Sequence, residues 1–129
     1  RKKYKMGKFE SFEEIISWQK SRLLNKRIYE ITSKEKFKTD FELIKQLRRA
    51  SISITSNIAE GFERNTDKEF IYFLYVAKAS SAEIRSQLYL ALDLEYITIR
   101  EHEELFSEVS EITKLISGLI KYLDKNQRS

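Results

Sequence analysis

Small polar side chains crowd the stretch RRASISITSNIAEGFERN, residues 48–65, where helical apolar spacing also runs through Ile54 and Ile58. Hydroxyls, an amide and a carboxylate at such short intervals could form a catalytic site, an anion cradle, a nucleic-acid surface or a polar seam between helices. Steps of four, four, three and four place five residues on one helical face: Arg49, Ser53, Asn57, Glu60 and Arg64. The segment therefore has one apolar face and one polar face.

The catalytic alternatives lack their partner residues. His102 is the only histidine, so neither a Ser-His-Asp arrangement nor the paired Glu-x-x-His motifs of a di-iron bundle can be assembled. The sequence HEELF at 102–106 lacks the second histidine of a metalloprotease helix, and NIAEGFERN lacks the glycines and lysine of a phosphate loop. We expect no catalytic residue, no metal site and no cofactor, a chain that is not an enzyme, and a solvated His102.

The remaining interpretation is a hydrogen-bonded seam within or between subunits. Small side chains let helix backbones approach closely, and a buried charge is costly unless it is paired. We therefore expect Arg48 or Arg49 to meet Glu60 or Glu83. The predicted seam or oligomer interface comprises Ser53, Asn57, Glu60, Tyr72, Tyr75, Lys78, Glu83 and Gln87.

Four helices are predicted to position these residues. The sequence has no proline and three glycines, and apolar residues recur at helical spacing. Expected starts are a capping box at Ser11–Glu14, Asp40, a box at Thr66–Glu69 and Thr98 with Glu101. The predicted core stripes are Phe12, Ile16, Leu23 or Leu24, Ile28, Ile31; Leu43, Leu47, Ala50, Ile54, Ile58; Phe70, Phe73 or Leu74, Ala77, Ser81, Ile84, Leu88, Ala91; and Leu105, Val109, Ile112, Ile116, Leu119 or Ile120, Leu123.

Short connections predict an all-α, antiparallel up-down-up-down four-helix bundle. Gly61 suits a left-handed position just after the second helix. Gly118 inside the fourth helix would be explained by a close helix crossing or by a bend. The start of the third helix, FIYFLYVA at 70–77, is apolar on every face, which leaves Tyr72 and Tyr75 uncovered in a lone bundle and predicts self-association.

Charge is unevenly distributed. Residues 1–8 hold five basic side chains and no acidic one, and the remaining 121 residues carry 19 basic and 20 acidic groups. We therefore expect a basic flexible tail at 1–10, the bundle at 11–124 and a C-terminal tail at 125–129. The basic start runs into Phe9 and Glu10, not into an apolar segment, and there is no cysteine. A cytoplasmic protein without a membrane span is expected.

The segment 46–88 resembles the four-helix-bundle protein family, also called 23S rRNA intervening-sequence proteins, and FEEIISWQKSRLL is similar to the family's first helix. The matching positions are Arg48, Arg49, Ala50, Ser53, Ile54, Asn57, Ile58, Ala59, Glu60, Gly61, Lys68, Glu69, Phe70, Phe73, Leu74, Ala77, Lys78, Ser80, Glu83 and Gln87. Thr55 stands where the family often has proline, and Ala79 where it has glycine.

The resemblance implies an antiparallel bundle assembling into a ring, typically a homopentamer, with no established enzymatic activity. The family's genes lie in insertions within large-subunit ribosomal RNA genes or are scattered elsewhere, and related bundles accompany retroelements. This setting suggests RNA or DNA as partner. We expect non-specific phosphate contacts from Arg48, Arg49, Arg64 and Lys68 and from the tail Arg1–Lys8. The alternative is a protein-interaction scaffold with no nucleic-acid ligand.

Overall fold

Helices make up most of the computed structural model, which describes residues 9–126. A 3₁₀ helix, η1 (Phe12–Glu14), is followed by α1 (Ile16–Thr32), α2 (Phe41–Phe62), α3 (Asp67–Asp93) and α4 (Ile99–Lys125). No strand is present in this range. The predicted all-α fold with four long helices is confirmed. Of the predicted tails at 1–10 and 125–129, residues 1–8 and 127–129 lie outside the described residues.

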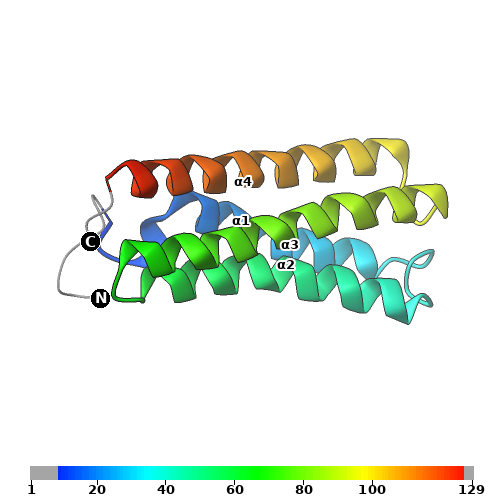
Figure 1. Ribbon diagram of the computed structural model, residues 1–129. Coiled ribbons are helices and arrows are strands. Elements are labelled where there is room, and N and C mark those ends of the chain that lie inside the picture. The colour runs from blue at the N-terminus through cyan, green and yellow to red at the C-terminus, as the bar shows by residue number, and fades with distance from the viewer. Residues whose placement is uncertain (1–8, 127–129) are drawn as a thin grey trace.

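The four helices lie side by side around one core (Figure 1). The α1–α2 and α3–α4 connections lie at one end, and the α2–α3 connection lies at the other (Figure 1). Within the described chain α1 contacts α2 and α4, and α3 contacts α2 and α4, but neither diagonal pair is in contact. The outer surfaces of α1 and α3 therefore face opposite ways.

The core follows the predicted stripes almost throughout. Every stripe residue of α2 is buried, as are those of α3 and α4 once Leu74 and Ile120 are taken from the paired alternatives. In α1 the prediction of Ile16 is wrong, since that side chain is 53% exposed and Ile15 is buried instead. The inward row of α1 continues through Ser17 and Ser21. A search for apolar spacing passes over these two serines and shifts the register by one residue.

The predicted helix starts are correct at three of four positions. Asp40 accepts a hydrogen bond from the Leu43 amide at 3.0 Å, and Thr66 accepts one from the Glu69 amide at 3.1 Å. Thr98 and Glu101 form a reciprocal capping box. The predicted box at Ser11 is wrong, because Ser11 makes no side-chain cap and the Glu14 carboxylate instead accepts from the backbone amide of Glu10.

Gly61 does not end α2, contrary to the prediction. It lies inside the helix, which continues to Phe62 and ends at Glu63 in right-handed conformation. A Cβ at Gly61 would lie 2.8 Å from Cδ1 of Phe70 and 2.8 Å from Cβ of Phe73. The glycine is therefore required by the close approach of α3, not by backbone conformation.

A left-handed residue does occur, at the end of α3. Glu95 has a φ of 62°, and its amide and that of Tyr96 donate to the carbonyls of Leu92 and Ala91, each at 2.9 Å. These two bonds are the Schellman pattern, in which glycine usually holds the position of Glu95.

The expectation of a solvated His102 is also wrong. The imidazole is 8% exposed and lies against the rings of Tyr89 and Phe106, at centroid distances of 4.8 and 5.4 Å. Its Nε2 is buried without a hydrogen-bond partner in the described chain. The glutamates around it in sequence point elsewhere, because His102 falls on the inward side of α4.

Candidate nucleic-acid interface

Among the described residues no three His, Asp or Glu side chains come together in a way that could hold a metal ion. No described helix is long and apolar enough to cross a membrane. The helix interfaces and the solvent-facing sides of the bundle are therefore the candidates for a functional surface.

The hydroxyls of residues 51–57 hold α2 to both of its neighbours. On one side, Asn25 of α1 donates to Thr55 at 3.0 Å and accepts from Ser51. On the other side, Ser80 of α3 donates to Ser53 at 2.8 Å. The crowded polar side chains thus serve contacts within one chain on two faces of the helix.

A similar contact joins α3 to α4, where the hydroxyls of Ser81 and Thr113 lie 2.8 Å apart. Asn57 by contrast bonds within its own helix, donating to the carbonyl and the hydroxyl of Ser53 at 2.8 and 3.0 Å. Hydroxyl pairs therefore join α2 to α3 and α3 to α4, the Asn25 amide joins α1 to α2, and Asn57 supports the Ser53 hydroxyl.

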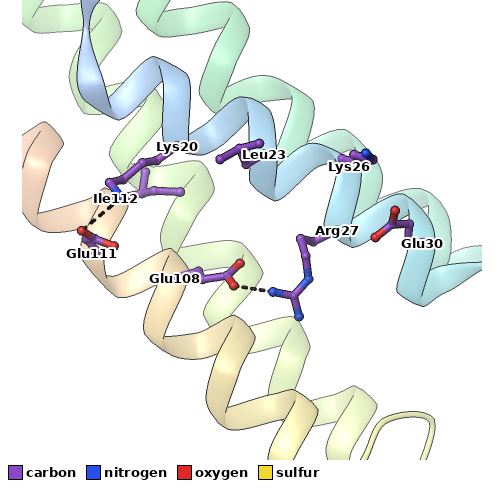
Figure 2. Close-up of a pocket in the computed structure, with 8 residues that line it drawn as sticks. All are labelled: Lys20, Leu23, Lys26, Arg27, Glu30, Glu108, Glu111 and Ile112. Carbon is purple, nitrogen blue, oxygen red and sulfur yellow. Dashed lines mark hydrogen bonds and ion pairs between the residues drawn. The ribbon is translucent and has the colours of Figure 1, made fainter.

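The fourth interface, between α1 and α4, is held by charge. Figure 2 shows Lys20 and Arg27 of α1 reaching Glu111 and Glu108 of α4 across an open groove of about 410 Å³. The Lys20 and Glu111 charges lie 3.5 Å apart, and Arg27 also approaches Glu104 at 3.6 Å. These contacts neutralise the cations that α1 directs towards α4.

Lys34, beyond the end of α1, extends this row of ion pairs to Glu101 at 2.9 Å. The hydrogen bond from the backbone amide of Thr98 and the nearby Lys34 ammonium hold the pKa of the Glu101 carboxyl below its usual value. At the same end the Tyr96 hydroxyl donates to Asp40 at 2.9 Å, and this bond raises the pKa of Tyr96.

Arg48 is fixed in a different way. Its guanidinium lies 4.2 Å from the ring centre of Tyr29, its Nε donates to the Thr32 hydroxyl at 3.0 Å, and a terminal nitrogen donates to Ser33 at 3.3 Å. No carboxylate of the described chain pairs with it, and Glu60 lies near Arg64 instead. The predicted pairing of Arg48 or Arg49 with Glu60 or Glu83 is thus not made within one chain and stays a prediction between subunits. The Arg48 guanidinium is therefore held in position, and no carboxylate of the described chain neutralises its charge.

The surroundings of Arg48 contain further cations without ion pairs. Arg22 lies over the Trp18 ring at 5.8 Å, and Lys26 and Lys45 are exposed. By helical register, the row along α1 is Trp18, Arg22, Asn25 and Tyr29, and the row along α2 is Phe41, Lys45, Arg48, Ile52, Thr55 and Ala59. Neither row has an acidic residue, whereas Lys26, which lies outside both rows, is followed one turn later by the exposed Glu30. We call Trp18, Arg22, Lys26, Tyr29, Lys45 and Arg48 the basic face.

The other predicted phosphate contacts lie elsewhere. Arg49 is exposed and points away from the α1 side of α2. Arg64 follows the end of α2, 3.7 Å from Glu60 and 4.9 Å from the Phe73 ring centre, near the exposed Lys68. Sixteen residues of helix separate Arg48 from Arg64, about 24 Å at 1.5 Å per residue. The four predicted residues therefore do not form one cluster.

The remaining predicted interface residues follow the solvent side of α3. Tyr72 and Tyr75 are 63% and 54% exposed, and Lys78 approaches the Tyr75 ring at 6.0 Å. Glu83 is exposed, while the Gln87 side-chain oxygen is buried without a partner in the described chain. The exposed apolar side chains expected on α3 are therefore present when one chain is considered alone.

Comparison with known proteins identifies the family of this chain. The model of the 23S rRNA-intervening sequence protein family matches residues 13–118. The chain belongs to this family. No curated protein has a sequence that matches it.

A solved structure supports membership in the intervening-sequence family. It is the crystal structure of a protein of unknown function from the S23 ribosomal protein family of Bacteroides thetaiotaomicron. The two chains share 30% sequence identity with a TM-score of 0.75, over 81% of this chain and 98% of the other. The four-helix arrangement is thus shared with a relative whose function is unknown.

Proposed function

We propose that this intervening-sequence family protein is a non-catalytic, cytoplasmic, homo-oligomeric bundle that binds RNA through phosphate contacts. Its four helices are arranged up-down-up-down, and copies assemble through α3 into a ring, as the family resemblance implies for a homopentamer. The description of the matching family names 23S rRNA, which supports a nucleic-acid ligand.

The observation that carries the proposal is the state of Arg48. A guanidinium fork binds phosphate well when its orientation is already fixed and its charge is not neutralised. The Tyr29 ring and the Thr32 and Ser33 hydroxyls supply that fixation without a carboxylate. Because the side chain is already ordered, binding loses less conformational entropy than it would with a free arginine.

Self-association rests on the outer side of α3. Tyr72, Tyr75, Tyr89 and Leu90 each expose about half or more of their surface along one helix. Tyr72 with Tyr75 and Tyr89 with Leu90 form two exposed apolar groups about 21 Å apart along α3, and exposed apolar groups of this kind favour a contact site. Since α1 lies diagonally opposite α3, assembly through α3 would leave the basic face of α1 and α2 open to a ligand.

A salt titration against a structured RNA tests the proposal. Each phosphate contact contributes about 0.7–0.9 to the slope of log affinity against log salt. Replacing Arg48 by glutamate is expected to weaken binding and to flatten the slope by roughly 0.8. Adding Arg49→Glu flattens the slope by roughly 1.5 in total only if Arg49, on the other side of α2, also contacts phosphate. The matched control reverses Lys114 and Lys121, two exposed cations on α4, and should bind like the parent.

The second candidate is a scaffold for another protein. It is favoured by the charge of the described chain, where residues 9–126 hold 18 basic and 20 acidic side chains. No RNA binding at low salt would reject the nucleic-acid proposal and leave this one. Light scattering of the purified protein gives the assembled mass, and a monomer would reject the ring.

A further inference from the structure

We propose that the RNA bound by this protein is single-stranded where it touches the basic face, with bases stacking on the cation–aromatic pairs of α1 and α2. This inference rests on the proposed function and adds to it the form of the ligand and three contact residues that the sequence had not indicated. These are Arg22, Lys26 and Lys45.

The first argument is chemical. The basic face pairs each of its two arginines with an aromatic ring, Arg22 with Trp18 and Arg48 with Tyr29. Unpaired bases stack on aromatic rings and on guanidinium planes, and such stacking tolerates any sequence. A duplex keeps its bases inside the helix and would use only the charges. Aromatic rings interleaved with cations therefore favour a single strand.

The second argument is spacing. Seven residues separate Arg22 from Tyr29, about 10.5 Å along α1. A strand stacked at roughly 3.4 Å per nucleotide would place about three nucleotides over that distance. Lys26 lies between the two platforms, and Lys45 lies one helical turn before Arg48 on α2. A short strand can thus reach both stacking platforms and the lysines beside them.

The third argument is the contrast with the other side of α1. Lys20, Arg27 and Lys34 are each within ion-pair distance of a glutamate of α4. In the part of the chain that the structure describes, Arg22, Lys26, Lys45 and Arg48 have no such pair. Arg22 and Arg48 lie on aromatic rings instead, and Lys26 lies at the outer edge of the α1–α4 groove without a carboxylate partner. Figure 2 shows Lys26 among the residues that line the groove between α1 and α4, without an ion pair to Glu108 or Glu111. The cations of the basic face therefore keep their charge for an external anion, and unlike the exposed Arg49, Lys114 and Lys121 two of them lie on aromatic rings.

The test compares a short mixed-sequence RNA oligonucleotide with the same strand annealed to its complement, using the full chain and fluorescence anisotropy. We expect the single strand to bind at least tenfold more tightly. Trp18 is the only tryptophan of the chain, so its intrinsic fluorescence should be quenched by the single strand and little changed by the duplex.

Two variants locate the contact. Arg22→Ala with Lys26→Ala is expected to weaken single-strand binding about tenfold or more, whereas Lys114→Ala with Lys121→Ala, a matched loss of two exposed charges, should not. Tyr29→Leu keeps the net charge and an apolar side chain, and should reduce the preference for the single strand. Thermal melts of each variant show whether it is folded.

The outcomes separate the two proposals. RNA binding that favours the duplex, or that leaves Trp18 fluorescence and the Arg22/Lys26 variant unaffected, overturns this inference and leaves the proposed function standing. Absence of RNA binding by the parent at low salt overturns both.

Discussion

The two helical glycines Gly61 and Gly118 should respond in opposite directions to the same substitution. At Gly61 an added methyl would lie 2.8 Å from carbon atoms of both Phe70 and Phe73. Carbon atoms in contact prefer about 3.5–4.0 Å, so α2 and α3 must separate by close to 1 Å or distort. The Phe73 atom is Cβ, which is fixed to the α3 backbone and cannot rotate away.

The cost at Gly61 can be estimated from this overlap. Overpacking a well-packed site typically costs about 1–3 kcal/mol. The gain in helix propensity from alanine offsets at most about 1 kcal/mol, and less here because Gly61 lies in the last turn of α2. We therefore expect Gly61→Ala to destabilise the protein by roughly 1–2 kcal/mol.

Gly118→Ala is the matched control. No atom lies within 4 Å of a Cβ built at Gly118, so the close crossing considered from the sequence is wrong within the chain. The substitution should stabilise α4 by about 1 kcal/mol through helix propensity alone. The two variants would then differ by about 2–3 kcal/mol, or roughly 6–12 °C in melting temperature.

Urea and thermal unfolding followed by far-UV circular dichroism measure both effects. The measurements need several protein concentrations, because association of copies would raise the apparent stability by mass action. A Gly61→Ala protein as stable as the parent would refute the close-approach argument. A destabilised Gly118→Ala protein would show that α4 needs its glycine for a contact or a bend absent from the isolated chain.

Three further predictions follow from individual residues. Glu95→Gly should stabilise the protein by about 1 kcal/mol in urea unfolding, since glycine adopts positive φ without the penalty of a side chain; an unchanged midpoint would contradict this. Glu101 has a lowered pKa in the folded state, so its contribution to stability is present above the pKa of the unfolded chain and is lost as pH falls through the folded pKa. Glu101→Gln should therefore reduce the loss of stability in acid. Equal pH profiles of stability for variant and parent would argue against this. Asn57→Ala should cost about 1 kcal/mol of stability because two hydrogen bonds of a half-buried amide are lost. Glu60→Ala should cost less, since Glu60 is exposed and its ion pair is with Arg64. If both variants match the parent in thermal melts and light scattering, the seam interpretation fails at these positions.

Local signals identified most helix starts and nearly all of the core. A capping side chain acts on amides within three residues of itself, so Asp40 and Thr98 could be recognised from the sequence. The stripes of α2, α3 and α4 could be predicted because these rows are almost entirely apolar. The row of α1 could not, since Ser17 and Ser21 occupy inward positions that periodicity assigns to apolar residues.

The environments of His102 and Gly61 depend on which helix packs against each residue. The inward position of His102 follows from its packing on Tyr89, and the need for glycine at position 61 follows from Phe73 on the next helix. Neither contact can be predicted from the residues that are adjacent in the sequence. Of the basic face only Arg48 was predicted as a phosphate contact, and the other members were missed for a similar reason. The spacing of Trp18, Arg22 and Tyr29 was a signal that could have located its α1 half.

The sequence by itself determined the helices, their order and the chemical types on each face, because helix propensity, capping and apolar periodicity act over a few residues. The tertiary structure alone decided which charges remain available. Lys20 and Arg22 are two residues apart on one helix, yet Lys20 meets Glu111 of α4 and Arg22 lies over Trp18 beside α2. A cation is neutralised or left uncompensated by the helix that packs next to it, and that choice is made only when the bundle closes.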